Sequence, residues 1–298
     1  MITVKVPATS ANVGSGFDAL GLAVTLYNTV TFEEWDHLEI RAADESDIPT
    51  EESNLVYQSV KAVYDRFGKT VPGLRIVQTN PIPMARGLGS SSACIVAGLL
   101  GANYLLGNPM DQHEVLTLAT QIEGHPDNVA PALLGGLTSC VLDDDGTVYG
   151  IARPVDDNLV FAAFVPDYPL LTEDARRALP ATVTHKEAVY NLSRAALVRA
   201  AFCDRCYELL RVCTKDSLQQ KYRLPLMPGG DQIFALSLAN GADAVYISGA
   251  GSTIMAVVKK EKADAFFARM ESALPADPKT KAFSLMRLTA DNTGATVY

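Results

Sequence analysis

The 298-residue sequence lacks the features of a secreted or membrane-spanning protein. Its start, MITVKVPATS, has no charged leader followed by an apolar core, so no signal peptide is expected. The longest apolar stretch, residues 93–107, is interrupted by Asn103 and falls short of the roughly 20 residues that a membrane span needs. These absences predict a cytoplasmic protein without a membrane partner.

Concentrated positive charge is also missing. The formal net charge is −9, the pI is about 5.0, and acidic and basic residues are scattered rather than grouped in blocks. Nucleic acids and anionic membranes need a concentrated basic surface, so neither is expected as a partner. A small anionic substrate is still compatible, because a few cations and a helix N-terminus can hold it whatever the net charge.

Cysteines are few and odd in number. A count of five in a chain without a secretion signal predicts free thiols. Cys203 and Cys206 have the spacing of half a zinc or redox motif, but no second Cys or His pair follows at ligand spacing. We expect buried or half-buried thiols on a helix there.

The hydrophobic pattern of the first half predicts strands, then helices, then strands again. Strands are expected at residues 2–6, 22–32, 74–78, 137–142 and 147–152, and helices from about Asn54, over 90–102 and over 112–123. The segment HPDNVAPALLGG, residues 125–136, is too rich in Pro and Gly for a helix interior and is expected to be a loop.

The pattern restarts after Arg153-Pro154, which predicts two domains, residues 1–153 and 154–298. The second half should hold strands at 159–165, 244–247, 253–258 and 283–288, with helices to about 213, after 230 and around 266–274. The stretch 214–230 is expected to be irregular. Interspersed strands and helices favour an α+β sandwich.

The segment Pro83-x-x-x-Gly87-Leu88-Gly89-Ser90-Ser91-Ser92-Ala93 is the strongest chemical signal. Glycines let the backbone approach a ligand closely, and serines open a helix whose free N–H groups and dipole attract phosphate. The segment is not a Walker A loop, since Gly-Lys-Ser/Thr is absent. A simple capped turn is the alternative, but the match extends from the strand through the proline and glycines into the helix.

This loop resembles the ATP-binding motif of the GHMP kinases, the superfamily of galactokinase, homoserine kinase, mevalonate kinase and phosphomevalonate kinase. PATSANVGSGFDALG, residues 7–21, and SGAGSTIMAV, residues 248–257, also resemble GHMP segments. The resemblance implies a two-domain GHMP kinase fold of the α+β class. Its N-terminal domain would be ribosomal-S5-domain-2-like α/β, and its C-terminal domain a ferredoxin-like α+β sandwich.

Within the superfamily the chain is most similar to the homoserine kinases, in residues 7–21, EGHPDNVAP (123–131), Thr172-x-x-x-Arg176 and YRLPL (222–226). That similarity implies ATP-dependent phosphorylation of the side-chain hydroxyl of L-homoserine to O-phospho-L-homoserine, in threonine biosynthesis. Two departures stand out: Ser252 replaces a proline found in many relatives, and LQQK (218–221) lacks an expected histidine.

The resemblance also implies roles for individual residues. The nucleotide would contact Pro83, Met84, Ala85, Arg86, Gly87, Leu88, Gly89, Ser90, Ser91, Ser92, Ala93 and Cys94, and Mg²⁺ would be held by Ser91 and Glu123. Asp18 would bind the ammonium of homoserine, Arg176 and Arg223 its carboxylate, and Asn12, His125, Asn128 and Thr172 would surround it. The chemistry is coherent, because arginine pairs bidentately with carboxylates and a carboxylate partners an ammonium.

Each assignment has a plainer alternative. Arg176 alone would read as a solvated helix-end arginine, and Asn12 and Asp18 as caps of turns. Glu123 would read as an exposed helix-end glutamate, and His125 as an ordinary loop histidine. Asp127 beside Asn128 fits a catalytic base or a loop cap and stays unassigned.

Other functions compete with this one. One alternative is a sister GHMP kinase acting on another small alcohol or phosphate ester, but a substrate with no carboxylate would leave the paired arginines without a role. Another is a catalytically silent metabolite sensor, which would not need an intact loop, Glu123 and the substrate arginines. Nucleic-acid binding conflicts with the acidic balance. A homodimer is compatible with the sequence.

Overall fold

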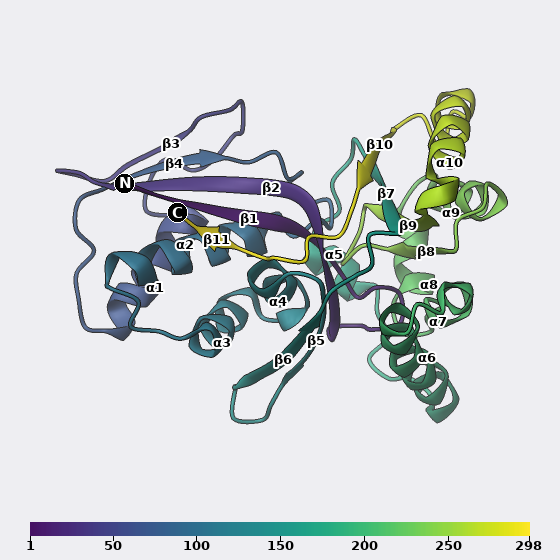
Figure 1. The fold of residues 1–298 in the computed structure, drawn as a ribbon, viewed down its shortest axis with the longest axis horizontal. Helices are drawn as coiled ribbons and strands as arrows, with labels where there is room; N and C mark the ends of the chain where they lie inside the picture. The colour runs from purple at the N-terminus through teal and green to yellow at the C-terminus, as the bar shows by residue number, and fades with distance from the viewer.

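The computed structural model describes all 298 residues, which form two β-sheets with helices packed on their faces (Figure 1). The first sheet has seven strands, β1 (Ile2–Ala11), β2 (Leu20–Glu34), β3 (Glu39–Ala42), β4 (Leu74–Thr79), β5 (Leu137–Leu142), β6 (Val148–Arg153) and β11 (Thr296–Val297). Their order is β11-β1-β2-β4-β3, with β5 pairing β2 and β6 pairing β5. All pairs are antiparallel except β3 with β4.

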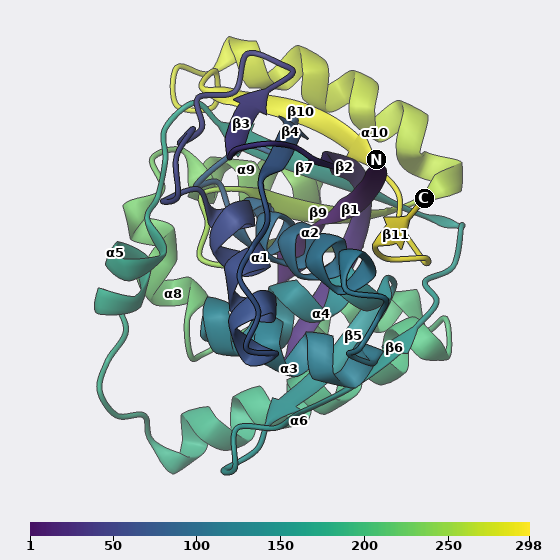
Figure 2. The same ribbon diagram turned by 90° about the vertical axis from the view of Figure 1, so that its left-hand side faces the viewer.

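Four helices cover one face of this sheet (Figure 2). They are α1 (Leu55–Arg66), α2 (Ser90–Leu105), α3 (Gln112–Glu123) and α4 (Pro126–Leu134). The predicted cap is confirmed, since the Asn54 side chain accepts from the N–H groups of Val56 and Tyr57. The predicted bounds of α3 are also confirmed, and its N-terminus carries a capping box of Asp111 and Glu114.

Helix α4 contradicts the expectation of a loop over residues 125–136. Pro126 occupies the first turn, where its missing N–H would have had no helical partner anyway. Pro131 lies inside the helix, so the carbonyl of Asp127 one turn earlier receives no helical hydrogen bond. Gly21 of β2 lies directly against that carbonyl, where a Cβ would collide with it. Tight packing on β2 therefore stabilises a helix that the Pro and Gly content argued against.

The second sheet has four antiparallel strands, β7 (Leu159–Pro166), β8 (Ala244–Ile247), β9 (Ile254–Lys259) and β10 (Phe283–Leu288), in the order β10-β7-β9-β8. The chain forms α10 (Lys260–Ala273) between β9 and β10, which flank β7. This arrangement is the split βαβ pattern of a ferredoxin-like sandwich, as the resemblance implied.

Both faces of the second sheet are buried. Alternate residues of β7 point to opposite sides, so Val160 and Ala162 join a core with α10 and α9 (Gly230–Ala239). Phe161 and Ala163 join a larger core that continues into the first sheet and includes residues of α6 (His185–Cys203) and α7 (Leu210–Cys213). The two sheets thus share a hydrophobic core.

Short helical segments and the C-terminal strand β11 complete the chain. The helical segments are α5 (Thr172–Arg177), α8 (Gln220–Arg223) and the 3₁₀ turns η1 (Tyr207–Leu209), η2 (Leu224–Leu226) and η3 (Leu274–Ala276). Strand β11 pairs with β1, so the last residues return to the first sheet. A division of the chain at residues 153 and 154 stays a prediction.

Several local expectations need revision. Strands β3 and β11 were not predicted, and the stretch 214–230 is partly helical in α8 and η2. All five cysteines are free, but Cys203 is exposed and Cys206 lies beyond the end of α6, so they are not both buried on a helix.

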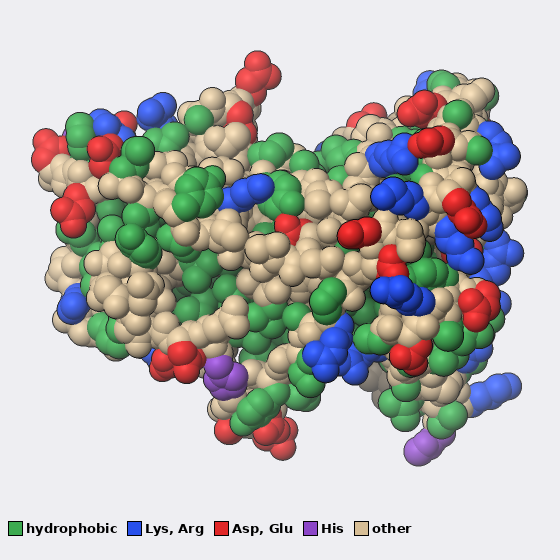
Figure 3. Space-filling view, in the orientation of Figure 1, with side chains coloured by type: hydrophobic (Ala, Val, Ile, Leu, Met, Phe, Trp, Pro, Cys, Tyr) green, Lys and Arg blue, Asp and Glu red, His purple; other side chains and the backbone are tan.

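The distribution of surface charge and the character of the helices can be compared with the expectations from composition. Acidic and basic side chains are interspersed on the face seen in Figure 3. None of the helices combines the length and the apolar character that crossing a membrane requires.

Candidate active site

One cavity of about 370 Å³ brings the three sequence motifs together. It is bounded by the loop between β4 and α2, the turn after β1, the glycine turn between β8 and β9, and the starts of α4 and α5. Most of the predicted site residues line it: Asn12, Asp18, Pro83, Met84, Ala85, Gly87, Leu88, Gly89, Ser90, Ser91, Cys94, Glu123, His125, Asn128, Thr172, Arg176 and Arg223.

Two glycines set the course of the loop before α2. Gly87 and Gly89 have φ angles of +78° and +69°, in the left-handed region that favours glycine. A Cβ on Gly87 would collide with the carbonyl oxygen of Ser248 in the glycine turn, and one on Gly89 with the hydroxyl of Thr9. Both positions therefore require glycine for conformation and for space.

The first turn of α2 presents free backbone donors to the cavity. Its N-cap is Gly89, which has no side chain to accept hydrogen bonds from the first N–H groups. Ser90 and Ser91, the first two helical residues, both line the cavity. Unpaired N–H groups and the positive end of the helix dipole favour an anion, so this end of the cavity fits a polyphosphate.

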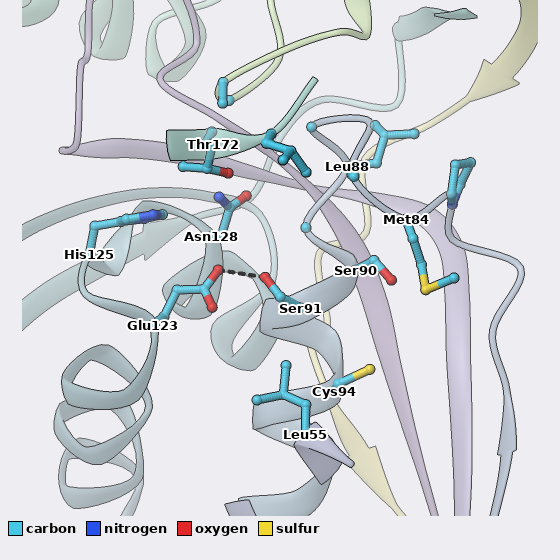
Figure 4. A pocket seen from close by; sticks show the side chains of 18 of the residues that line it. Leu55, Met84, Leu88, Ser90, Ser91, Cys94, Glu123, His125, Asn128 and Thr172 are labelled. Atoms are coloured by element: carbon cyan, nitrogen blue, oxygen red, sulfur yellow. Dashed lines mark hydrogen bonds between the residues drawn. The ribbon is translucent and has the colours of Figure 1, made fainter. Parts of the chain in front are cut away.

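Glu123 lies beside this helix start. It is the last residue of α3, and its carboxylate accepts hydrogen bonds from the hydroxyls of Ser91 (2.8 Å) and Ser92 (2.7 Å). Figure 4 shows the bond to Ser91. A carboxylate and a hydroxyl are oxygen donors of the kind that Mg²⁺ prefers, so the residues present fit a nucleotide-bound magnesium ion.

Three residues of the predicted nucleotide set do not line the cavity. The Arg86 guanidinium donates to the backbone carbonyls of Met84 (3.0 Å), Pro166 (3.0 Å) and Asp167 (2.9 Å), so it ties the loop to the end of β7. Ser92 is buried against Glu123, and Ala93 is packed in the core. A motif match includes the whole run of residues, whereas a helix turns some of its side chains away from any one ligand.

Sequence reasoning missed the end of the cavity beyond Ser90 and Cys94. Its lining includes Ile48, Pro49, Asn54, Leu55, Val56, Gln78 and Asn80. Figure 4 shows Leu55, Met84 and Cys94 around the start of α2. Burial raises the pKa of the Cys94 thiol to about 11, helped by the charge of Glu123, so the thiol stays neutral. The one available signal was an isolated Ile48 in a polar stretch before a capped helix.

Opposite charges face each other at the other end of the cavity. The Arg176 guanidinium forms a bidentate pair with the carboxylate of Asp18, with both N···O distances at 3.0 Å. The two side chains are 38% and 36% exposed, so they remain accessible. Burial opposes the charge on Arg176, but the hydrogen bonds and charge of Asp18 outweigh it and raise the pKa of Arg176. Thr172 lies one helical turn before Arg176 and also lines the cavity.

Arg223 is only 2% exposed, yet it lines the cavity. Its Nη1 donates to Gln219 Oε1 (2.8 Å) and to the carbonyl of Gly249 (3.0 Å), and its Nε donates to the carbonyl of Ala175 (3.4 Å). Its Nη2 makes no hydrogen bond within the protein. Burial, and then the positive charge of Arg176, lower the pKa of Arg223 to about 10. The guanidinium thus keeps its charge at neutral pH and has donors left for a ligand.

Two residues that sequence reasoning did not single out hold these arginines. The Phe17 ring lies 5.7 Å from the guanidinium carbon of Arg176 and 5.2 Å from that of Arg223. Gln219, in the segment 218–221 that lacks the expected histidine, accepts from Arg223 and donates to the carbonyl of Gly14 (3.2 Å). Only the three-dimensional arrangement identifies their roles.

Both polar atoms of the Asn12 side-chain amide make hydrogen bonds within the protein. Its Nδ2 donates to the carbonyl of Gly249 (2.8 Å), and its Oδ1 accepts from the backbone N–H of Asp18 (3.0 Å). It therefore caps the turn that carries Asp18, as the plainer alternative had it, and also joins that turn to the glycine turn. A direct contact of its amide with substrate stays a prediction.

The start of α4 contributes a histidine, an aspartate and an asparagine. The Nδ1 of His125 pairs with the buried carboxylate of Asp127 (2.6 Å). Burial opposes the charged form of His125, but that hydrogen bond and the charges of Asp127, Glu123 and Asp18 raise its pKa. Asn128 Oδ1 accepts from the hydroxyl of Thr9 (2.8 Å), which leaves its Nδ2 available as a donor in the cavity.

Comparisons with known proteins agree with this architecture. The model of the GHMP kinases N terminal domain matches residues 54–136, and that of the GHMP kinases C terminal domain matches residues 194–276. The homoserine kinase of Clostridium beijerinckii is 44% identical over 299 residues, covering 100% of this chain and 98% of the relative. That of Caldicellulosiruptor saccharolyticus is 45% identical over 300 residues, with coverages of 100% and 97%.

Solved structures show the same similarity. The crystal structure of homoserine kinase from Cytophaga hutchinsonii matches with a TM-score of 0.86 at 29% identity, covering 100% of this chain and 97% of that one. A putative homoserine kinase from Listeria monocytogenes matches with a TM-score of 0.83 at 31% identity, with coverages of 100% and 99%. On its full-length identity to curated relatives and on both domain matches, this chain belongs to the homoserine kinases of the GHMP kinase superfamily.

Proposed function

We infer that this protein transfers the γ-phosphoryl group of ATP to the side-chain hydroxyl of L-homoserine, giving O-phospho-L-homoserine for threonine biosynthesis. The observation that carries this inference is the sharing of one cavity by an uncapped helix start and by the charged cluster of Asp18, Arg176 and Arg223. The first suits a polyphosphate, and the second suits an amino acid.

The nucleotide is proposed to lie along the loop and the start of α2. The backbone N–H groups of Ser90 and Ser91 would receive phosphate oxygens. Ser91 and Glu123 would hold Mg²⁺, whose bound charge neutralises the phosphates during transfer. The apolar end of the cavity near Leu55 and Met84 would take the base.

The substrate is proposed to lie among the charged residues. Homoserine carries a positive ammonium and a negative carboxylate. Each is opposite in charge to one member of the Asp18–Arg176 pair. The ammonium would bind Asp18, and the carboxylate would accept hydrogen bonds from Arg176 and from the free Nη2 of Arg223. Because Asp18 and Arg176 remain partly exposed, a zwitterion can replace their mutual contact without burying an unpaired charge.

The reacting hydroxyl is proposed to be oriented by Asn128. The Thr9 hydroxyl donates to the Oδ1 of Asn128, so the Nδ2 of Asn128 faces the substrate. That Nδ2 would donate to the homoserine hydroxyl and orient it for attack. Phosphoryl transfer depends on positioning and charge neutralisation more than on a strong base. Asp127 already pairs with His125, which favours a positioning role over that of a base.

A side-by-side assay of ADP release tests the function. The protein is incubated with ATP, Mg²⁺ and one of homoserine, serine, threonine, galactose or mevalonate. We expect homoserine to give the highest kcat/KM. Faster turnover of galactose or mevalonate would identify a sister kinase, and ATP binding without turnover of any of the five alcohols would favour a catalytically silent sensor.

The cytoplasmic location and the homodimer stay predictions. ATP use and five free thiols are compatible with the reducing cytoplasm. Sedimentation of the purified protein would test for the homodimer.

A further inference from the structure

The segment that connects β7 to α5 is tied to the loop between β4 and α2. It runs from Pro166, the last residue of β7, to Leu170. The Arg86 guanidinium donates from Nε to the carbonyl of Pro166 (3.0 Å) and from Nη2 to that of Asp167 (2.9 Å). The N–H of Leu170 donates to the carbonyl of Ala85 (3.1 Å). These hydrogen bonds hold the connecting segment against the loop that leads into α2.

Helix α5, which follows this segment, has few contacts of its own. Only Ala175 of its six residues is buried, and its N-cap makes no side-chain hydrogen bond. A helix this short is not stable by itself, because too few backbone hydrogen bonds offset the ordering of the chain. Its other ties are the bond from Arg223 Nε to the carbonyl of Ala175 (3.4 Å) and the pair of Arg176 with Asp18. The position of α5 therefore depends on these ties and on the connecting segment.

Substrate binding would remove one of these ties. The zwitterion proposed above replaces the contact between Asp18 and Arg176, so α5 loses its direct link to the turn after β1. The connecting segment then holds the start of α5. Ser252 supplies one bond to that segment, from its hydroxyl to the carbonyl of Tyr168 (3.0 Å), and Arg86 supplies two, on consecutive carbonyls. The contribution of Arg86 to the position of α5 is therefore greatest when substrate is bound.

We propose that Arg86 is a positioning residue for homoserine: it holds α5, and with it Arg176, at the distance from the phosphates that the substrate spans. This inference rests on the proposed function, because it assumes that Arg176 binds the homoserine carboxylate. Arg86 does not line the cavity, and all three of its guanidinium nitrogens donate to backbone carbonyls. It therefore acts through the backbone and contacts neither ligand. Its planar guanidinium suits this role, since its donors lie in a fixed fork.

Arg86→Met removes the donors and keeps an unbranched apolar stem. The measured quantities are kcat/KM for homoserine and for homoserinol, which lacks the carboxylate, and the KM for ATP. Homoserinol is the reference substrate, because its turnover does not depend on where Arg176 lies. Arg211→Met is the matched control: Arg211 Nη2 also donates to two backbone carbonyls, those of Leu238 (3.3 Å) and Ala242 (3.2 Å), but outside the cavity.

In Arg86→Met we expect kcat/KM for homoserine to fall by about 3- to 30-fold, mostly through KM, with little change for homoserinol or in the KM for ATP. Arg211→Met should lower the midpoint of thermal unfolding and leave the ratio of the two kcat/KM values as in wild type. Arg86→Lys keeps the charge but not the fork, so it should show a smaller loss, again for homoserine only. This milder variant carries the test if Arg86→Met does not fold.

Three outcomes would overturn the proposal. Unchanged or equally lowered kcat/KM for homoserine and homoserinol would show that Arg86 does not act through the carboxylate site. A rise in the KM for ATP larger than that for homoserine would make Arg86 a nucleotide contact, as the resemblance implied. The same change of substrate ratio in Arg211→Met would mean that lost stability explains the effect.

The wild-type protein separates this inference from the proposed function. An absence of homoserine turnover by wild type would refute the proposed function itself. Wild-type turnover together with equal losses for both substrates in Arg86→Met would leave the kinase activity intact and remove only the role of Arg86.

Discussion

The phosphate end of the cavity comes from one short stretch of chain, whereas the substrate end is assembled from segments far apart in sequence. Residues 83–94 supply the loop and the start of α2, and Glu123 is the one distant addition. The substrate end joins Asp18 to Arg176, 158 positions apart, and Asn12 to Gly249, 237 positions apart. The first end works through backbone N–H groups and the second through side-chain charges.

This difference predicts different sensitivities. A change of backbone conformation should damage the phosphate end most, because its donors belong to the backbone. A change of side-chain charge should damage the substrate end, because its contacts are ion pairs.

The largest effect is expected from an alanine in the loop. Gly89 and Gly107 lie at opposite ends of α2 with φ angles of +69° and +84°, but a Cβ on Gly107 would meet no atom within 4 Å. Both alanines should cost about 1–2 kcal/mol of unfolding free energy through backbone strain. Gly89→Ala should also displace Thr9 and lower kcat/KM for ATP on the order of 10²- to 10³-fold, while Gly107→Ala should not.

Steady-state kinetics with varied ATP, calorimetric ATP binding and thermal unfolding of both variants check this expectation. A folded Gly89→Ala protein with wild-type ATP affinity would show that the loop does not hold the phosphates.

Glu123→Gln should have the next largest effect. It removes negative charge beside Ser91 and the proposed metal without touching the substrate, so kcat should fall by about 10- to 100-fold with little change in the KM for homoserine. Raising the Mg²⁺ concentration should recover part of the loss. Glu271→Gln, an exposed glutamate in the last turn of α10, is the matched control. Unchanged Mg²⁺ dependence in Glu123→Gln would reduce Glu123 to a helix-end residue.

Asp127→Asn should have the smallest effect on chemistry. If Asp127 positions His125, kcat should fall by less than about tenfold, whereas loss of a required base costs 10²-fold or more. A larger loss with undisturbed stability and affinity would identify Asp127 as the base.

The same variant should change the pH dependence of stability. Asp127 helps to raise the pKa of His125 above 6.5, so the stabilisation by charged His125 is fully present below that value. It is lost as the pH rises through the raised pKa of the folded protein. Denaturant unfolding at a series of pH values should show this loss in wild type and a weaker one in Asp127→Asn.

Local sequence patterns predicted much of the fold and the phosphate end. Asn54 and the bounds of α3 were readable because caps and periodicity act over a few residues. Helix α4 could not be predicted in this way, because the packing that stabilises it despite Pro131 comes from Gly21 on the distant strand β2. Tertiary packing overrode local propensity there.

The substrate end was predictable as a set of residues but not as an arrangement. The resemblance named Asp18, Arg176 and Arg223, yet no pattern could show that the first two pair with each other or that Arg223 is buried against Gln219. The apolar end of the cavity was missed, because its lining comes from three separate segments, residues 48–49, 54–56 and 78–80, that meet only in the fold.

Recognition of a zwitterion by the substrate end is the central claim, and one comparison tests it most directly. The kcat/KM values of homoserine and homoserinol, which lacks the carboxylate, are measured for wild type, Arg176→Leu and the neighbouring control Arg177→Leu, whose side chain pairs with Glu173 and Asp174 outside the cavity. Arg176→Leu should lower kcat/KM for homoserine by about 10- to 150-fold, mostly through KM, and leave the already poor homoserinol nearly unchanged. An equal loss for both substrates would contradict the account, because Arg176 would then act on something other than the carboxylate.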